Sequence, residues 1–168
     1  MTTVGDPTVD YRPEQPYMGI RTQVPMRGMF TVVAQSRKEL STWLKQQGVD
    51  AAGPPFLRYH VIDMAGEMDI EVGFPVVRAL PTDGRVSAGM LPAGRYASLI
   101  YRGNGLTGNK TLLDWAKARG LVWERWTDEK GDAFGARYET FLTDPTVEPR
   151  KTKWDIEVAI KLRDDEVE

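Results

Sequence analysis

The sequence predicts an α+β fold in which a single β-α-β-β unit occurs twice. The letters DIEV stand at 69–72 and again at 155–158, each time followed by a mostly apolar stretch. Each half also contains an amphipathic helical segment that ends at a glycine, flanked by alternating segments with β-branched residues. Such a repeat predicts two matching halves that join into one antiparallel sheet, with a ligand groove between them along the pseudo-twofold axis.

Length and composition describe one ordinary domain. The chain has 168 residues, of which 41% are hydrophobic and 27% charged, as in soluble globular proteins. The 22 basic and 24 acidic side chains leave a net charge of −2, which disfavours a broad basic face for nucleic acid. The absence of cysteine excludes disulfides and thiolate chemistry. A single histidine, His60, excludes a multi-histidine metal centre. We expect neither a metal nor a cofactor.

The location and the domain boundaries follow from the distribution of apolar residues. The first residues lack the apolar core of a signal peptide, and no apolar run is long enough to span a membrane. We therefore expect a cytoplasmic protein without membrane or nucleic-acid partners, for which a homo-oligomer stays open. The expected parts are an extended N-terminal arm at 1–16, a single domain at 17–162 with pseudo-repeats at about 17–80 and 85–162, and an acidic tail at 163–168.

The first half opens with strand signals. Three prolines within residues 1–16 suit an extended arm. Residues 18–24 and 29–35 contain β-branched side chains, and we predict them as strands bent at Pro25 and Gly28.

A helix is predicted next. Ser36 and Glu39 have the spacing of a capping box, in which each side chain bonds to the other residue's backbone amide. An apolar stripe with i, i+3, i+4 spacing begins at Leu40, and Gly48 ends it.

The second half repeats this order. The long strand predicted at 86–101 is bent at Pro92 and Gly94, and a second helical stripe begins at Leu112 and ends at Gly120. The other predicted strands cover residues 55–63, 68–76, 136–144 and 154–162.

The spacing between matching residues supports duplication. Leu40 and Leu112 are 72 positions apart, while Asp69 and Asp155 are 86 apart. The offset is constant within an element and grows only between elements, where insertions are tolerated. A chance repeat would not follow element boundaries in this way.

Alternation within the strands predicts which side chains line the groove. Successive side chains of a strand point to opposite faces, so Glu71 and Glu157 point away from the apolar side chains that pack on the helices. We therefore expect both glutamates in a groove on the face that the helices leave bare. The alternative is that they are simply solvated, as most glutamates on a half-exposed sheet are.

Aromatic side chains are candidates for the walls of the groove. Tyr59 and Tyr101 lie on predicted strands next to it, and packing in the core is the alternative for both. Trp123 lies with Trp126 in an insertion at 121–134, where exposed tryptophans suggest a lid over the groove.

Several segments together resemble the GyrI-like small-molecule-binding family. In order, they are GPPFLRYH at 53–60, EVGFPV at 71–76, LPAGRYASLIYRG at 91–103, YETFLTDP at 138–145 and IEVAIKL at 156–162. The similarity covers about residues 17–162. It implies an SHS2-type tandem fold in its standalone form. It also implies a groove for lipophilic, often cationic, aromatic ligands, as in the effector-binding domains of multidrug-sensing regulators.

The resemblance also implies which residues line that groove. The family's pocket glutamate falls on Glu139, with Phe141 where a tyrosine is common, and a second acidic position falls on Glu157. Ala159 stands where the family usually has an aromatic residue, which suggests a pocket of different shape. Arg137 should point the same way as Glu139, and it could neutralise that acid and favour neutral or anionic ligands.

Three classes of function follow from the resemblance. The leading expectation is binding, by sequestration or sensing, of amphipathic aromatic small molecules, cationic ones included. The first alternative is a hydrolase that opens reactive cyclopropane-bearing natural products, with Glu139 as its catalytic residue. The second is a protein-binding module such as a gyrase inhibitor, which no residue specifically supports.

Overall fold

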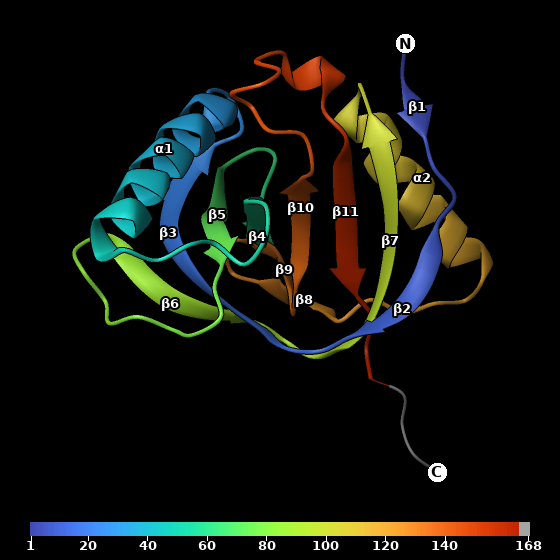
Figure 1. Ribbon diagram of the computed structural model, residues 1–168. Helices are drawn as coiled ribbons and strands as arrows, with labels where there is room; N and C mark the ends of the chain where they lie inside the picture. The colour runs from blue at the N-terminus through green and yellow to red at the C-terminus, as the bar shows by residue number, and fades with distance from the viewer. Residues whose placement is uncertain (165–168) are drawn as a thin grey trace.

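The computed structural model describes residues 1–164, which form one large antiparallel sheet with two helices (Figure 1). Along the hydrogen-bonded path the strand order is β1-β7-β11-β10-β4-β5-β3-β6. The predicted α+β class with its tandem β-α-β-β architecture is confirmed. In chain order the elements are β1 (Thr3–Val4), β2 (Thr8–Arg12), β3 (Gln15–Pro25), α1 (Met29–Gln47), β4 (Phe56–Ile62), β5 (Glu67–Pro75), β6 (Val86–Leu91), β7 (Gly94–Arg102), α2 (Gly105–Ala118), β8 (Arg125–Asp128), β9 (Gly131–Phe134), β10 (Arg137–Phe141), the 3-10 helix η1 (Lys151–Lys153) and β11 (Ile156–Lys161).

The strand order contains the two expected halves. The first half contributes β3, α1, β4 and β5, and the second contributes β7, α2, β10 and β11. The halves join where β4 pairs with β10, with Leu57 opposite Glu139 and Arg58 opposite Tyr138. Glu139 therefore lies on a strand at the junction of the two halves.

The start of α1 differs from the prediction. The strand predicted at 29–35 is wrong, because these residues form the beginning of the helix. Gly28 adopts a left-handed conformation, with φ of 83°, directly before it, and Ser36 is buried inside the helix instead of capping it. Burial of one face outweighs the β preference of the branched residues, because the buried side chains recur at helical spacing. They are Met29, Val33, Ser36, Leu40 and Leu44.

Two extended segments cross from one half of the sheet to the other. β2 pairs with β7 of the second half and continues through residues 13–14 into β3 of the first half. β6 pairs with β3, and residues 92–93 lead from it into β7. These two crossing segments, which we call the straps, run side by side across the bottom of Figure 1. The expected N-terminal arm thus joins the sheet, and the strand predicted at 86–101 divides into two at its predicted bend.

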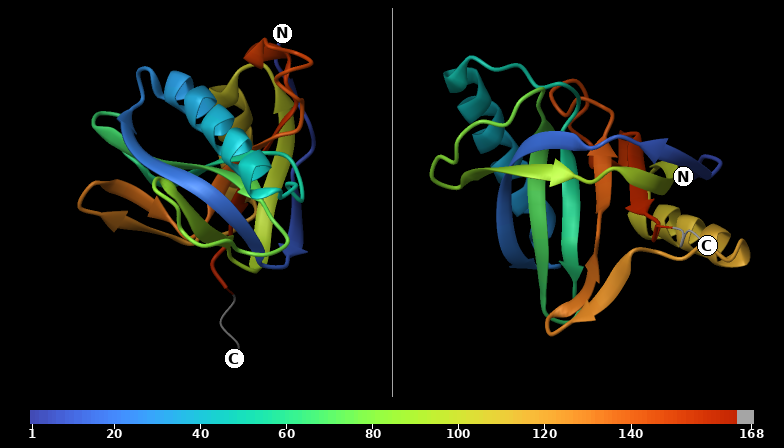
Figure 2. Two further views of the ribbon diagram at one scale, coloured as in Figure 1. Left: turned by 60° about the vertical axis from the view of Figure 1, so that its left-hand side comes forward. Right: turned by 90° about the horizontal axis from the view of Figure 1, so that it is seen from below.

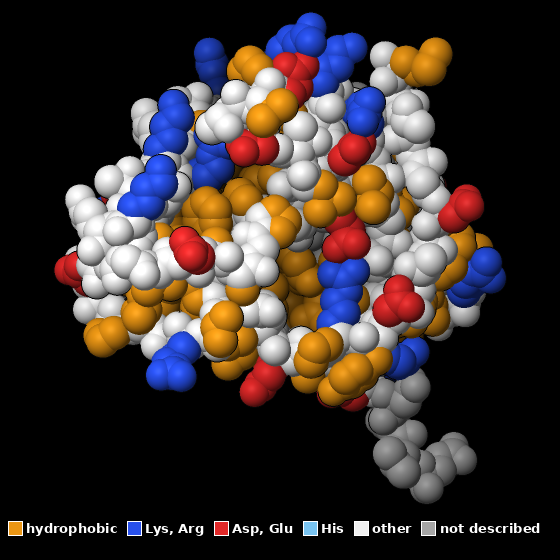
Figure 3. Space-filling view, in the orientation of Figure 1, with side chains coloured by type: hydrophobic (Ala, Val, Ile, Leu, Met, Phe, Trp, Pro, Cys, Tyr) orange, Lys and Arg blue, Asp and Glu red, His pale blue; other side chains and the backbone are white. Residues whose placement is uncertain are grey.

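The two faces of the sheet carry separate cores. On the helix face, α1 and α2 pack against side chains such as Ile70 and Val158. On the opposite face, which we call the strap face, Phe56, Tyr96 and Tyr138 belong to a second buried cluster with the strap residue Leu91. The face that the helices leave bare is therefore covered in part by the straps. Figure 3 shows hydrophobic side chains gathered in a hollow between the two halves.

The insertion at 121–134 forms a hairpin. Its strands β8 and β9 pair with each other, and β9 also pairs with the end of β4. The hairpin projects beyond the end of the sheet (Figure 2). It extends the sheet of the first half although it belongs to the second half in sequence.

Two expectations concern the ends and the surroundings of the chain. Most of the expected acidic tail, 163–168, lies outside the described residues. Within residues 1–164, no helix is long and apolar enough to cross a membrane.

Candidate functional site

A cavity of about 330 Å³ opens on the helix face, between the N-terminal ends of α1 and α2. Tyr59 of β4, Tyr101 of β7 and Glu139 of β10 line it from the sheet, while Phe30 of α1 and Leu106 of α2 line it from the helices. We call it the Glu139 cavity. Both halves of the repeat contribute to it, so the cavity exists only when the two halves are folded together.

Glu139 is buried in the floor of this cavity, with only 6% of its surface exposed. The Tyr59 hydroxyl donates to Glu139 Oε1 at 2.7 Å, and the Tyr101 hydroxyl donates to Glu139 Oε2. Burial, together with the negative charge of Glu139, raises the pKa of both tyrosines above the usual value. Both hydroxyls therefore stay protonated at neutral pH, and the carboxylate oxygens keep lone pairs for a further donor.

Two cationic side chains, Arg137 and Lys151, also line the cavity. Among the described residues, no ion pair joins Arg137 to Glu139, and Nη2 of Arg137 donates instead to Oδ1 of Asn109 at 2.8 Å. Lys151 Nζ lies 4.3 Å from the ring centroid of Phe30, which is a cation–π distance. Burial lowers the pKa of both cations, and the attraction of Glu139 opposes the shift. The cavity thus combines one carboxylate, two cations and aromatic walls.

Glu71 and Glu157 do not line the Glu139 cavity. Both lie on the strap face, where Glu71 accepts a hydrogen bond from the Tyr17 hydroxyl at 2.5 Å. Glu157 pairs with Arg12 at 2.9 Å. The expectation of a single hollow containing all three carboxylates is wrong, because strand alternation puts two of them on the opposite face.

The other predicted site residues also lie outside the cavity. Phe141 is on the helix face but packs edge-on against Trp154, with ring centroids 5.6 Å apart. Trp123 is half-buried against the core and, like the rest of its hairpin, is not a lid on this cavity. The single histidine, His60, is also outside the cavity, and its Nε2 lies 2.8 Å from Glu71 Oε1.

Sequence reasoning missed several residues that line the cavity, among them Phe30, Asn109 and Lys151. Phe30 was hidden by the strand prediction, although the spacing of Met29 and Val33 is helical and would have revealed α1. Lys151 stands in a short 3-10 helix between two strands, where no periodicity points to a role.

Residues 1–164 contain no group of three or more histidine, aspartate or glutamate side chains that could hold a metal ion.

A family model described as the GyrI-like small molecule binding domain matches residues 5–163, nearly the whole chain. No curated protein matches the chain in sequence.

Several solved structures have the same fold at low sequence identity. The EcmrR C-terminal domain is 16% identical, with a TM-score of 0.74 over 96% of this chain and 99% of that one. EcmrR in a DNA complex is 15% identical, with a TM-score of 0.75 over 95% of this chain. The chain spans only 58% of the length of that EcmrR chain. A hydrolase from Listeria innocua is 12% identical, with a TM-score of 0.62 over 94% of this chain and 91% of that one. SAV2435 bound to tetraphenylphosphonium is 9% identical, with a TM-score of 0.53 over 94% of each chain.

Proposed function

Because the chain belongs to the family of GyrI-like small-molecule-binding domains, we propose that it binds amphipathic aromatic compounds, cationic ones included, in the Glu139 cavity. In this proposal it sequesters or senses them in the cytoplasm. The observation that carries the proposal is a buried carboxylate that faces an aromatic-lined cavity.

The chemistry of the cavity suits such a ligand. A buried carboxylate loses hydration, and two tyrosine donors compensate only part of the loss, so a bound organic cation gains from Glu139. The rings of Phe30, Tyr59 and Tyr101 add apolar contact and cation–π attraction, each of about 0.5–2 kcal/mol. Apolar contact has no direction, so one cavity accepts several related compounds.

The volume sets the size of the ligand. At about 330 Å³ the cavity is at the lower end of the range of small-molecule pockets, which begins near 300 Å³. The part of the ligand that enters is therefore compact, such as two or three fused rings, and any larger substituents extend to the opening between the helices.

We test this proposal with rhodamine 6G, a cationic aromatic dye, and the variant Glu139→Gln. The substitution keeps the shape of the side chain and removes its charge, so dye affinity should fall by about tenfold or more, which is about 1.4 kcal/mol. Fluorescence anisotropy titration measures the change.

The matched control is Glu157→Gln, which makes the same change on the same sheet but on the strap face. Its dye affinity should stay within about twofold of the unchanged protein. Equal affinity of Glu139→Gln and the unchanged protein, or an equal loss in both variants, would contradict the proposal. Ring-opened product from a cyclopropane-bearing aromatic substrate, absent with Glu139→Gln, would instead support the hydrolase alternative.

A further inference from the structure

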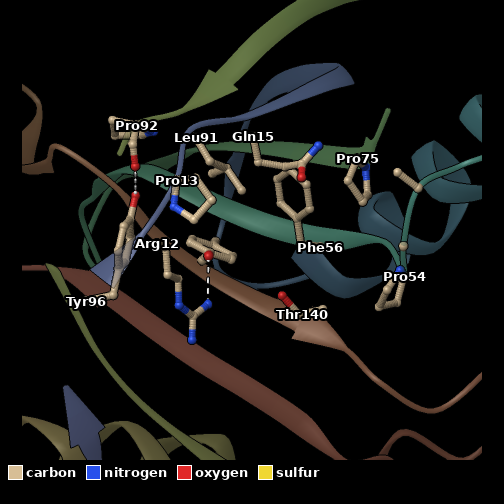
Figure 4. Close-up of a pocket in the computed structure, with 13 residues that line it drawn as sticks. Arg12, Pro13, Gln15, Pro54, Phe56, Pro75, Leu91, Pro92, Tyr96 and Thr140 are labelled. Carbon is tan, nitrogen blue, oxygen red and sulfur yellow. Dashed lines mark hydrogen bonds between the residues drawn. The ribbon is translucent and has the colours of Figure 1, made fainter. Parts of the chain in front are cut away.

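The strap face contains a second cavity, of about 310 Å³, that is separate from the Glu139 cavity (Figure 4). Strand β10 runs between the two. Tyr138 and Thr140 line the second cavity, while Arg137 and Glu139 line the first, because neighbouring side chains of a strand point to opposite faces. The two cavities are therefore back to back across the sheet.

The walls of the second cavity come from the sheet and from both straps. Phe56 of β4 and Tyr138 of β10 form its sheet side, with ring centroids 5.6 Å apart. Pro13 and Pro92, one from each strap, face it from the other side (Figure 4). Proline has a fixed φ and no backbone donor, so these walls are stiff and apolar.

Hydrogen bonds hold both straps in place around the cavity. The Tyr96 hydroxyl donates to the carbonyl oxygen of Pro92 at 2.7 Å (Figure 4). Arg12 Nη1 donates to the Tyr138 hydroxyl at 2.9 Å. Arg12 also donates to Glu157 at 2.9 Å and to Ser98 at 3.2 Å. The cavity is therefore already formed before any ligand enters.

Two polar groups on the wall have hydrogen-bonding capacity left. Arg12 has five N–H donors, and three donate to partners in the described chain, which leaves two. The Thr140 hydroxyl, which also lines the cavity, has no hydrogen-bond partner among residues 1–164. Both groups suit a ligand that carries a hydrogen-bond acceptor.

The charge of the second cavity is balanced, in contrast to the Glu139 cavity. Its one charged wall residue, Arg12, is paired with Glu157, so an ionic ligand would lose hydration without gaining a free counter-charge. Aromatic rings and prolines in the walls favour a ring system, which can contact the rings by stacking or edge-on, and the balanced charge favours an uncharged one.

From these observations we propose a second small-molecule site on the strap face, which binds an uncharged, planar heteroaromatic compound through an acceptor facing Arg12 and Thr140. The site does not depend on the proposed function of the Glu139 cavity, with which it shares only the strand β10.

The experiment titrates ¹⁵N-labelled protein with coumarin, an uncharged bicyclic lactone whose carbonyl is an acceptor. We expect saturable shifts at the amides of Tyr96, Tyr138 and Thr140, with smaller shifts at Phe30 and Leu106. Two variants fill the cavity from different walls, namely Thr140→Phe from the sheet and Ala52→Trp from the rim. Each should weaken coumarin binding at least about tenfold.

The control variant is Glu139→Gln, which changes the neighbouring residue on the other face and should leave coumarin affinity within about twofold. Rhodamine 6G affinity should fall in Glu139→Gln and stay within about twofold in the two cavity-filling variants. Failure of one proposal therefore does not imply failure of the other. Coumarin shifts centred on Phe30 and Leu106, or no saturable binding, would overturn the second site. If the amide spectra show that neither filling variant folds, the proposal is judged from the coumarin-induced amide shifts of the unchanged protein.

A separate titration tests whether the second site prefers an uncharged ligand. Coumarin-3-carboxylate, an anion with the same rings, should bind more weakly than coumarin because Glu157 already occupies Arg12. Tighter binding of the anion would show that the ligand class is wrong.

Discussion

Lys151 puts a positive charge where a cationic ligand would find its aromatic contact. Its ammonium lies over the ring of Phe30 and feels the charge of Glu139 across the cavity. A ligand cation must displace this ammonium or bind beside it and suffer repulsion. The balance between Glu139 and Lys151 therefore sets how strongly the cavity prefers cations over neutral aromatic compounds.

Replacing Lys151 with methionine should strengthen rhodamine 6G binding by about three- to tenfold. The variant keeps an unbranched apolar side chain over Phe30 but removes the competing charge, so the effect is opposite in sign to that of Glu139→Gln. Anisotropy titration of both variants measures it.

Lys153→Met is the control for this prediction, because Lys153 lies in the same 3-10 helix but does not line the cavity. It should leave dye affinity within about twofold. Weaker binding by Lys151→Met than by the unchanged protein would show that Lys151 assists the ligand instead of competing with it.

At the scale of elements, α1 shows how a glycine at each end sets the limits of a helix. Gly28 before it and Gly48 after it are both left-handed, with φ of 83° and 68°. The amide of Gly48 donates to the carbonyl of Lys45, which would otherwise have no hydrogen-bond partner at the end of the helix. Because Phe30 stands in the first turn, the position of this start also places an aromatic wall of the Glu139 cavity.

Gly28→Ala and Gly48→Ala should each lower the free energy of unfolding by about 1 kcal/mol. A Cβ at either position meets no atom within 4 Å, so the loss comes from backbone conformation and not from a clash. Urea unfolding followed by circular dichroism measures it.

The comparison variant for these glycines is Gln35→Ala, at an exposed position inside α1. Alanine favours a helix, so stability should stay equal or rise slightly. If Gly28→Ala were as stable as Gln35→Ala, the left-handed start of the helix would be in doubt.

At the scale of the whole molecule, the straps connect the halves that the β4–β10 pair joins. Arg12, from the first strap, donates to Ser98 of β7, Tyr138 of β10 and Glu157 of β11. One guanidinium thus holds the strap to three strands of the second half. Arg12 also lines the second cavity, so the same contacts support its wall.

Arg12→Met should lower the free energy of unfolding by about 1.5–3 kcal/mol, because it removes charge-assisted hydrogen bonds and leaves Glu157 without its partner. The double variant with Glu157→Gln should lose less than the sum of the two single variants. Urea unfolding of all four proteins completes the cycle. Additive losses would mean that the Arg12–Glu157 pair contributes nothing to stability.

Local patterns predicted most of the elements. Alternation predicts the strands near 55–63, 68–76, 136–144 and 154–162, and helical spacing predicts α2, which ends at Ala118, two residues before the predicted stop at Gly120. The wrong strand prediction at 29–35 has a physical cause. β-branched residues favour strands locally, but burial of one apolar stripe in the tertiary structure stabilises a helix here.

The sequence by itself determined that the chain is doubled, that Glu71 and Glu157 share one face, and that Glu139 is the acid to examine. The doubling and the shared face follow from periodicity, which is a local property of the chain, whereas Glu139 was singled out by the resemblance to the GyrI-like family. Only the tertiary structure decided which face holds Glu139, because that depends on where the helices pack and not on the order of letters in β10. It also decided that the straps cover the opposite face and form a second cavity there, since strand pairing between segments about 80 residues apart has no local signature.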